Sequence, residues 1–153
     1  MKQLLTIALL ISTMTISSCD KRVKHSSENP LITEWNTPYG IPPFDEIRDE
    51  HYAPALKYAM AQHLAEIDAI ATNTDEPTFD NVMLAYDRSG ELLSRVSLTF
   101  EMICAAEKND YLTEVEEEMM PQLAAHYDQI LMNDALFAKI KVLHDKRRAL
   151  GLD

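Results

Sequence analysis

The feature that most constrains this chain is a long apolar stripe between Pro77 and Glu107. If the segment is helical, one face collects side chains spaced about 3.6 residues apart: Phe79, Val82, Met83, Tyr86, Leu93, Val96, Phe100, Ile103 and Cys104. Gly90 lies on the same face, and Thr78 is suited to cap the start of the helix. We therefore expect one long helix over residues 79–107, bent at most slightly near Gly90, where a neighbouring helix backbone comes close.

The length of this helix argues against a compact bundle. At about 1.5 Å per residue, a helix over residues 79–107 is roughly 43 Å long. A compact globule of about 135 residues has a diameter of only about 37 Å. We therefore expect an elongated slab of helices, one side of which is covered by something else.

Apolar periodicity also predicts a helix over roughly Asp49–Thr72. Its stripe is Tyr52, Leu56, Ala59, Met60, His63, Ile67 and Ile70. A histidine on such a face is more typical of a hydrogen-bonded core residue than of a ligand, so we expect His63 to be buried and paired. Pro54 is compatible with a helix only near the first turn, which puts the start near Glu50 or His51.

Two more helices follow the break at residues 109–110. The first has the stripe Leu112, Val115, Met119, Leu123, Tyr127, Ile130 and Leu131, and Pro121 inside it predicts a kink or two abutting helices. The second begins at an Asn133 cap and has the stripe Leu136, Phe137, Ile140, Leu143 and His144. Gly151 fits its C′ cap, with Leu152 available for the accompanying contact. The predicted fold is all-α, with four main, mostly antiparallel helices.

The segment Asn29–Asp45 is of a different kind. It holds four of the seven prolines and one of the three glycines, so it is neither helix nor central strand. We expect an extended N-terminal strap, held on the helical body by aromatic and apolar anchors: Trp35, Tyr39, Ile41 and Phe44. An aromatic ligand-binding box is the alternative.

The N-terminus has the layout of a secretory signal peptide. A Met-Lys start precedes an apolar run from Leu4 to Ile16, which is shorter than the about 20 residues of a membrane span. The run ends in Ile-Ser-Ser-Cys, which resembles the lipobox of bacterial lipoproteins, so we expect Cys19 to be lipidated. Residues 1–18 are then a lipoprotein signal peptide and residues 19–28 a polar tether. An ordinary signal peptide with an incidental cysteine is the alternative. With the lipobox, the expected location is the bacterial cell envelope, as a periplasmic or outer-membrane lipoprotein anchored to the membrane.

Composition and motifs argue against several classes of function. The formal net charge of −11 argues against nucleic acid as a partner. With Cys19 lipidated, Cys104 is left to pack as a small apolar residue. None of the five histidines begins an H-E-x-x-H motif, two cysteines give no zinc knuckle, and three glycines give no phosphate-binding loop. The sequence predicts no catalytic residue and no metal ligand in this chain.

Four stretches, taken in order, resemble one protein family: TPYGIPPFDEIRDEHYAPAL, AEIDAIATN, PTFDNVMLAYDRSGELLSRV and MNDALFAKIKVLHDKRRALGLD. They resemble the N-terminal region of bacterial peptidyl-dipeptidases, which belong to the thimet-oligopeptidase family of zinc metallopeptidases. The resemblance covers residues 29–153. It implies a partial domain of a larger helical, clam-like peptidase, whose zinc site lies in a catalytic domain absent from this chain. It also implies that the full-length enzyme holds zinc and removes dipeptides from the C-terminus of short peptides.

The same resemblance implies a role for residues 29–153 as part of the wall of the substrate channel. The scaffold of that wall would include His51, Tyr52, Arg88 and Arg95. The leading interpretation is thus an N-terminal fragment of a lipid-anchored peptidase that is inactive alone. The alternative is a free-standing helical lipoprotein that binds peptides or a partner protein. It requires a polar surface where the catalytic domain would pack, and the broad stripes, rich in methionine and aromatic residues, argue mildly against it. An active enzyme formed by this chain alone is disfavoured.

Overall fold

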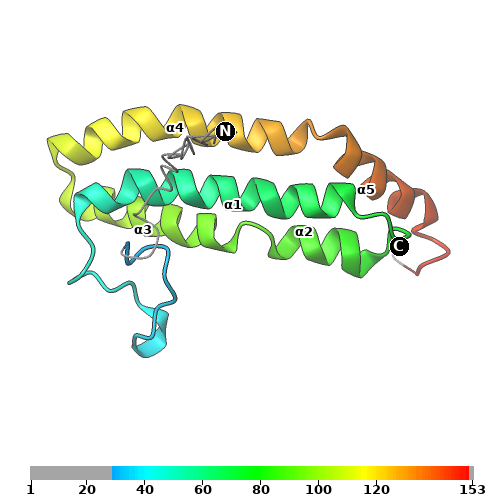
Figure 1. Ribbon diagram of the computed structural model, residues 1–153, viewed down its shortest axis with the longest axis horizontal. Coiled ribbons are helices and arrows are strands. Elements are labelled where there is room, and N and C mark those ends of the chain that lie inside the picture. Colours follow the sequence, from blue (N-terminus) through cyan, green and yellow to red (C-terminus); the bar gives the residue numbers. More distant parts are fainter. Residues whose placement is uncertain (1–28, 152–153) are drawn as a thin grey trace, which may run out of the picture.

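The computed structural model describes residues 29–151, which form helices preceded by an irregular N-terminal segment (Figure 1). Two short 3₁₀ turns, η1 (Pro38–Gly40) and η2 (Asp49–His51), come before the main helices. These are α1 (Tyr52–Thr72), the π-helical segment η3 (Phe79–Leu84), α2 (Ala85–Arg88), α3 (Glu91–Glu107), α4 (Asp110–Leu131) and α5 (Asp134–Lys146). The described residues contain no strand, and the all-α prediction is confirmed. The predicted signal peptide, Cys19 and the tether lie outside the described residues.

The helices form an elongated slab with α1 in its middle (Figure 1). Helices α2 and α3 lie end to end along one side of α1, and α4 runs along the other side. Helix α5 follows α4 at the far end of the slab and contacts both α1 and η3. The elongated shape agrees with the prediction, although the helix on which that prediction rested is divided.

The prediction of one continuous helix over residues 79–107 is wrong. Ser89 is extended, with φ −71° and ψ 151°, and Gly90 is left-handed, with φ 73° and ψ 16°. Helix α2 therefore ends at Arg88 and α3 starts at Glu91. Glycine tolerates the left-handed conformation because it has no Cβ. The stripe still packs on α1 across the break, since Val82 and Leu93 are both buried, but Phe79 at its start is exposed.

The buried side chains form two apolar clusters along the slab. The first cluster joins Leu31 to α1, α3 and α4 and consists of Leu31, Tyr52, Ala55, Leu56, Ala59, Met60, Leu93, Val96, Phe100, Leu112, Val115, Met119 and Leu123. The second cluster joins the end of α1 to η3, α4 and α5 and consists of Ile67, Ile70, Val82, Ile130, Leu136 and Leu143. All seven residues of the predicted α1 stripe are buried, including His63. This stripe was predicted correctly because α1 is packed on two sides.

Helices α4 and α5 differ from their predictions in detail. Helix α4 continues through Pro121 as one element, so two abutting helices are excluded. Pro121 is exposed, where water can satisfy the carbonyl that lost its donor. His126 takes the buried position that Tyr127 was expected to hold. Four further residues of the predicted stripes are not in the core: Leu131, Phe137 and His144 are exposed, and Ile140 is half-buried.

The helix caps mostly agree with the sequence. Thr78 Oγ1 accepts from the Asn81 amide at 3.1 Å, and Asn133 Oδ1 accepts from the Leu136 amide at 3.0 Å. Gly151 has the expected positive φ of 69°, but a turn over residues 147–150 separates it from the end of α5. It is therefore not the C′ residue of that helix. Its proposed contact with Leu152 lies outside the described residues.

The N-terminal strap is anchored by fewer residues than predicted. Leu31 is fully buried, and Trp35 is half-buried, with its indole nitrogen donating to the Pro30 carbonyl at 2.7 Å. The other three predicted anchors are exposed: Tyr39 at 100%, Ile41 at 53% and Phe44 at 42%. Residues 36–46 project from the slab instead of lying across it (Figure 1). An anchor must be covered by other side chains, and these three are not covered.

Candidate functional site

Among the described residues, the two buried histidines lie with nearby polar groups between the two apolar clusters. We call this set the histidine layer: His63 and Glu66 from α1, Ser89 and Gly90 from the α2–α3 break, and His126 from α4. His63 Nδ1 and His126 Nε2 are 2.9 Å apart, and His63 Nε2 is 3.3 Å from Ser89 Oγ. Both imidazoles are buried, with 8% and 4% of their surface exposed. The prediction that His63 is a hydrogen-bonded core residue is confirmed.

The hydrogen bonds of this layer assign the protons. Ser89 Oγ donates its single proton to the Tyr86 carbonyl at 2.7 Å, so it accepts from His63 Nε2. His63 Nδ1 is then unprotonated and accepts from His126 Nε2–H. His126 Nδ1 is left as a buried acceptor without a hydrogen-bond partner among the described residues. When both rings are neutral, each ring N–H therefore has an acceptor: Ser89 Oγ for His63 and His63 Nδ1 for His126.

Gly90 fits the layer because its backbone passes directly over the His63 ring. A Cβ atom at this position would lie 2.8 Å from His63 Cε1 and 2.9 Å from both ring nitrogens. The Gly90 amide also donates to Glu66 Oε2 at 2.7 Å. We expected the backbone of a neighbouring helix to come close at Gly90; the group that lies against it is instead the His63 side chain of α1, at the helix break.

Burial sets the titration behaviour of the pair. Removal from water lowers the pKa of His63, and the Glu66 carboxylate opposes this effect. Removal from water also lowers the pKa of His126, and a charge on His63 lowers it further. Both imidazoles are therefore held neutral at neutral pH.

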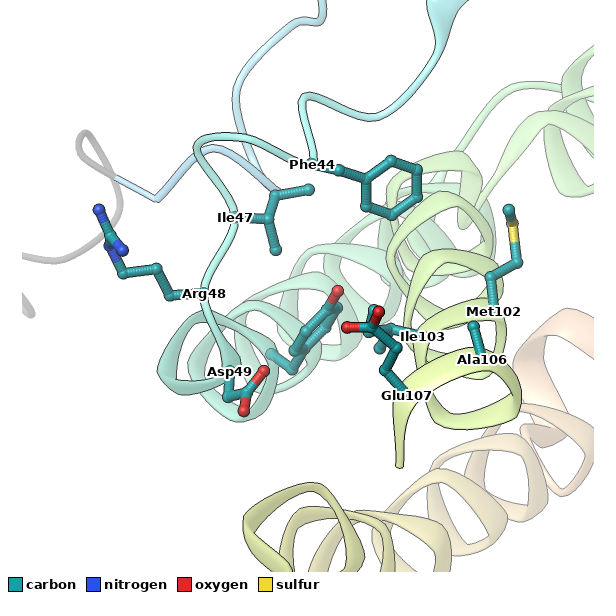
Figure 2. A pocket seen from close by; sticks show the side chains of 9 residues that line it. Phe44, Ile47, Arg48, Asp49, Met102, Ile103, Ala106 and Glu107 are labelled. Carbon is teal, nitrogen blue, oxygen red and sulfur yellow. The ribbon is translucent and has the colours of Figure 1, made fainter. Parts of the chain in front are cut away.

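A second candidate is a hollow of about 530 Å³ between the segment at residues 44–52 and the C-terminal half of α3 (Figure 2). Its apolar lining is Phe44, Ile47, Tyr52, Met102, Ile103 and Ala106. Charged side chains at Arg48, Asp49 and Glu107 complete it. The hollow is suited to hold an apolar side chain beside a polar group.

Two groups at or near this hollow, Tyr52 and Cys104, have raised pKa values. Burial, with a smaller effect of the Asp49 charge, raises the pKa of Tyr52 to about 12. The Tyr52 ring packs against Phe100, with centroids 5.3 Å apart. Burial also raises the pKa of the half-buried Cys104 thiol, with a smaller contribution from Glu116, so the thiolate is disfavoured. These groups are therefore packing residues.

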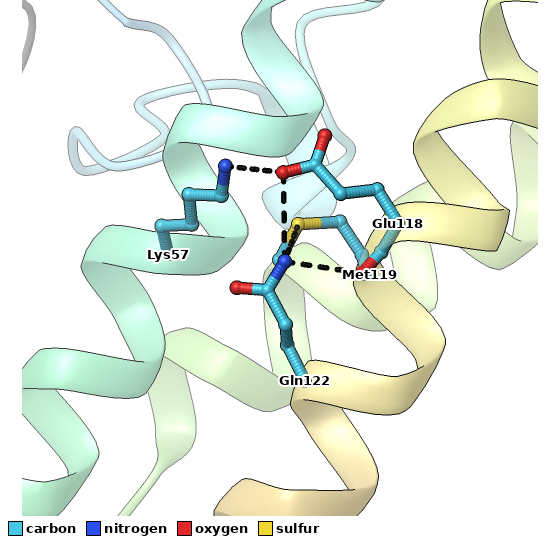
Figure 3. Close-up of polar contacts among 4 residues, drawn as sticks. All are labelled: Lys57, Glu118, Met119 and Gln122. Atoms are coloured by element: carbon cyan, nitrogen blue, oxygen red, sulfur yellow. Dashed lines mark hydrogen bonds and ion pairs between the residues drawn. The ribbon is translucent and has the colours of Figure 1, made fainter.

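On the opposite side of α1, polar side chains join this helix to α4 at the surface (Figure 3). Lys57 Nζ contacts Glu118 Oε1 at 2.6 Å, and the Gln122 amide donates to the Glu118 carbonyl at 3.0 Å. The hydrogen bond from Lys57 is the main cause of the lowered pKa of Glu118. All three side chains are exposed, so this is an ordinary surface contact between helices.

The residues assigned by resemblance to a channel-wall scaffold lie apart from one another. His51 accepts the Arg48 amide on its Nδ1 at 3.1 Å and closes the turn before α1. Arg88 is exposed at the end of α2 beside the break. Arg95 lies over the Trp35 ring, 4.6 Å from its centroid, and donates to the Thr33 carbonyl at 3.0 Å. Tyr52 and Arg95 thus have clear structural roles, in the core and in holding the strap.

The described residues offer no metal centre. Among residues 29–151, no group of three or more histidine, cysteine or acidic side chains is placed to hold a metal ion. His63 and His126 are hydrogen-bonded to each other, so the layer does not fit zinc. None of the helices in this range has the length and apolar character of a membrane span.

The sequence analysis did not predict His126 as a member of the site. Its position three residues after Leu123, on the same helix face, is the feature of the sequence that could have indicated it.

Known proteins resemble this chain over most of its length. No family model matches it. The dipeptidyl carboxypeptidase of Escherichia coli (strain K12) is 42% identical over 125 residues, which cover 82% of this chain and 18% of that protein. The enzyme of the same description from Salmonella typhimurium (strain LT2) is 42% identical over 127 residues, covering 83% and 19%. Oligopeptidase A of the same Salmonella strain is 22% identical over 117 residues, covering 76% and 17%.

The chain therefore spans about a fifth of the length of the curated relatives it matches. The matched part has an all-helical structure in which the described residues hold no metal centre. This chain is a homologue of the N-terminal region of a peptidyl-dipeptidase.

Proposed function

We propose that this chain is the N-terminal part of a zinc peptidase that removes dipeptides from the C-terminus of short peptides. The observation that carries the proposal is the 42% identity to two dipeptidyl carboxypeptidases, whose name describes that reaction. The zinc and the groups that activate water would belong to a catalytic part other than residues 29–151. The present chain would serve substrate access, and we expect it to be inactive alone.

The shape and surface of the slab support a wall-forming role. The slab is elongated (Figure 1), and several large apolar side chains are exposed on α3 and the strap, among them Phe44, Leu98 and Met102. Exposed apolar side chains of this kind favour burial against another part of a larger protein. A wall made of packed helices would admit extended peptides and exclude folded proteins.

The lipid anchor belongs to the same proposal. Acylation of Cys19 would hold the peptidase on a membrane of the bacterial envelope, with residues 19–28 as a tether between lipid and slab. The sequence Ile16-Ser17-Ser18-Cys19 after an apolar run supports this location.

Determining the DNA sequence downstream of the codon for Asp153, and expressing the complete product, provides the test. We expect the frame to continue into an H-E-x-x-H motif with a downstream glutamate. The complete product and the chain alone are each incubated with a blocked tripeptide, and mass spectrometry follows dipeptide release with and without a zinc chelator. Chelator-sensitive release by the complete product only is the expected result. A complete product without dipeptide release, or chelator-sensitive release by the chain alone, would overturn the proposal.

Thermal unfolding distinguishes the alternative, a free-standing lipoprotein that binds peptides or a partner protein. A cooperative, monomeric transition of the purified chain supports an independent domain. Aggregation or loss of near-ultraviolet dichroism at room temperature supports a part that needs its covering domain.

A further inference from the structure

The histidine layer has no part in the proposed peptidase reaction, yet it joins three elements at one level of the slab. Along α1, His63 lies between Met60 of the first cluster and Ile67 of the second. Along α4, His126 lies between Leu123 and Ile130 in the same way. The layer is therefore the polar boundary between two apolar clusters.

When both rings are neutral, each ring N–H of the layer has an acceptor, and a bare acceptor at His126 Nδ1 is left over. A proton on His63 Nδ1 replaces the acceptor of the His126 N–H by a second donor, which breaks the 2.9 Å contact. A proton on His126 Nδ1 creates a buried cationic N–H without an acceptor among the described residues. A proton on His63 Nδ1 therefore removes the hydrogen bond that joins α1 to α4 at this level, whereas a proton on His126 Nδ1 leaves that bond in place and adds a buried charge without a partner.

The groups facing the pair compensate at most one positive charge. From α1, the Glu66 carboxylate is the acidic neighbour of His63, and one of its oxygens already accepts the Gly90 amide at 2.7 Å. From the α2–α3 break, the facing groups are the Ser89 hydroxyl and the Gly90 backbone. From α4, the Tyr127 ring lies edge-on to both imidazoles, with centroid distances of 6.5 and 5.2 Å. Two cations with nitrogens 2.9 Å apart would repel each other with little nearby to offset them.

We propose that the histidine layer is an acid-operated latch. In the neutral form, His63 holds α4 through His126 and the α2–α3 break through Ser89. When the pair takes up protons, the His63–His126 contact opens. The second cluster, with η3, α2, the end of α4 and α5, then loosens relative to the first.

The direction of the pKa values agrees with this behaviour. Burial lowers the pKa of both imidazoles below the ordinary value of about 6.5. The folded state thus binds fewer protons than the open state in the range below about 6.5. The latch is closed above that value, and it opens as the pH falls toward the lowered pKa values of the folded protein.

Hydrogen–deuterium exchange of the purified chain at pH 7.5 and 5.0, corrected for the intrinsic pH dependence of exchange, tests the latch. We expect the protection of amides in residues 85–90 and 124–131 to fall by a larger factor than that of α3, because the contact that holds these segments to α1 is lost in acid. The variant His126→Phe keeps an aromatic ring against Tyr127 but removes the acid-sensitive contact. In this variant the difference between the two pH values should shrink to that of α3.

The matched control is His144→Phe, which alters an exposed histidine of α5. This control should keep the full response of the wild type to acid. Equal responses of wild type, His126→Phe and His144→Phe would overturn the proposal. So would a wild type whose protection near the layer falls no more than in α3.

A second measurement covers the case in which His126→Phe does not fold. Nitrogen-15 spectra of the histidine rings in the wild type should show His63 and His126 as Nε2–H tautomers at pH 7.5. Their titration midpoints should lie below the ordinary value of about 6.5 and coincide with the loss of amide protection. Midpoints at or above that value, or the opposite tautomers, would refute the latch.

Discussion

Replacing Gly90 by alanine should destabilise the fold by two separate effects. A left-handed alanine costs roughly 1–2 kcal/mol more than a left-handed glycine. The new Cβ would also lie 2.8 Å from His63 Cε1, so the ring must move out of the layer. Leaving buried groups of the layer without their hydrogen bonds costs about 1–3 kcal/mol more. The expected loss in the free energy of unfolding is therefore roughly 2–5 kcal/mol.

Gly40→Ala is the matched control because it isolates the first effect. Gly40 also has a positive φ, 66°, but a Cβ there meets no heavy atom of the described residues within 4 Å. Its substitution should cost only the conformational term of about 1–2 kcal/mol. Urea unfolding followed by far-ultraviolet circular dichroism measures both variants under identical conditions. The excess for Gly90→Ala over Gly40→Ala is then the cost of displacing His63.

The double variant His63→Ala/Gly90→Ala separates this steric effect from a general sensitivity of the break. Without the imidazole, the new methyl group has room, so Gly90→Ala should cost about 1–3 kcal/mol less in that background. The reasoning is refuted if Gly90→Ala costs no more than Gly40→Ala. It is also refuted if the two substitutions at residues 63 and 90 are additive.

Three further outcomes are expected. Phe100→Ala should lower the free energy of unfolding by about 3–5 kcal/mol, because the ring is fully buried against Tyr52. Phe137→Ala, at a position that is 63% exposed, should change it by less than about 0.5 kcal/mol in the same urea assay. Stability should be full above about pH 6.5 and should fall below it by at most about 1.4 kcal/mol per pH unit for each buried histidine, measured by urea unfolding from pH 7.5 to 5. Cys19→Ala should abolish incorporation of a labelled fatty acid in growing bacteria, and labelling that persists in this variant would contradict the lipid anchor.

The helix break shows what residue periodicity leaves undetermined. The stripe over residues 79–107 has the same spacing whether the helix is continuous or is divided into two pieces that lie end to end on α1. The local signal for a break was the dipeptide Ser89-Gly90, a common turn sequence. It was outweighed by the favourable periodicity on both sides. In the structure, Gly90 lies against the His63 ring of α1, a contact between two helices that the stripe does not contain.

Helix α4 shows that periodicity also leaves undetermined which of two neighbouring residues is buried. After Leu123, both His126 and Tyr127 continue a helical stripe, because steps of three and four residues alternate along one face. Hydrophobicity favours the tyrosine, and the sequence prediction followed it. The structure buries the histidine because His63 on α1 provides a hydrogen-bond partner at that level. Pairing across 63 residues of sequence has no local signature.

The strap was predicted correctly as a non-helical segment and incorrectly in its anchoring. Proline and glycine report on local backbone conformation, which the sequence contains. Burial of Tyr39 or Phe44 depends on contacts with other parts of the protein. Tyr39 is fully exposed, and Phe44 borders the open hollow beside α3 and stays 42% exposed. Trp35 differs because Arg95 of α3 lies over its ring.

The histidine pair also fixes how α4 sits along α1. The buried faces of both helices are otherwise apolar, and apolar side chains tolerate a shift of one helical turn, about 5.4 Å. Such a shift would bring Leu123 or Ile130 opposite His63 and leave its Nδ1 without a donor. An unsatisfied buried group costs about 1–3 kcal/mol, enough to make the shifted arrangement at least about fivefold less populated. The polar layer thus selects one register for a helix pair whose apolar contacts alone would permit several.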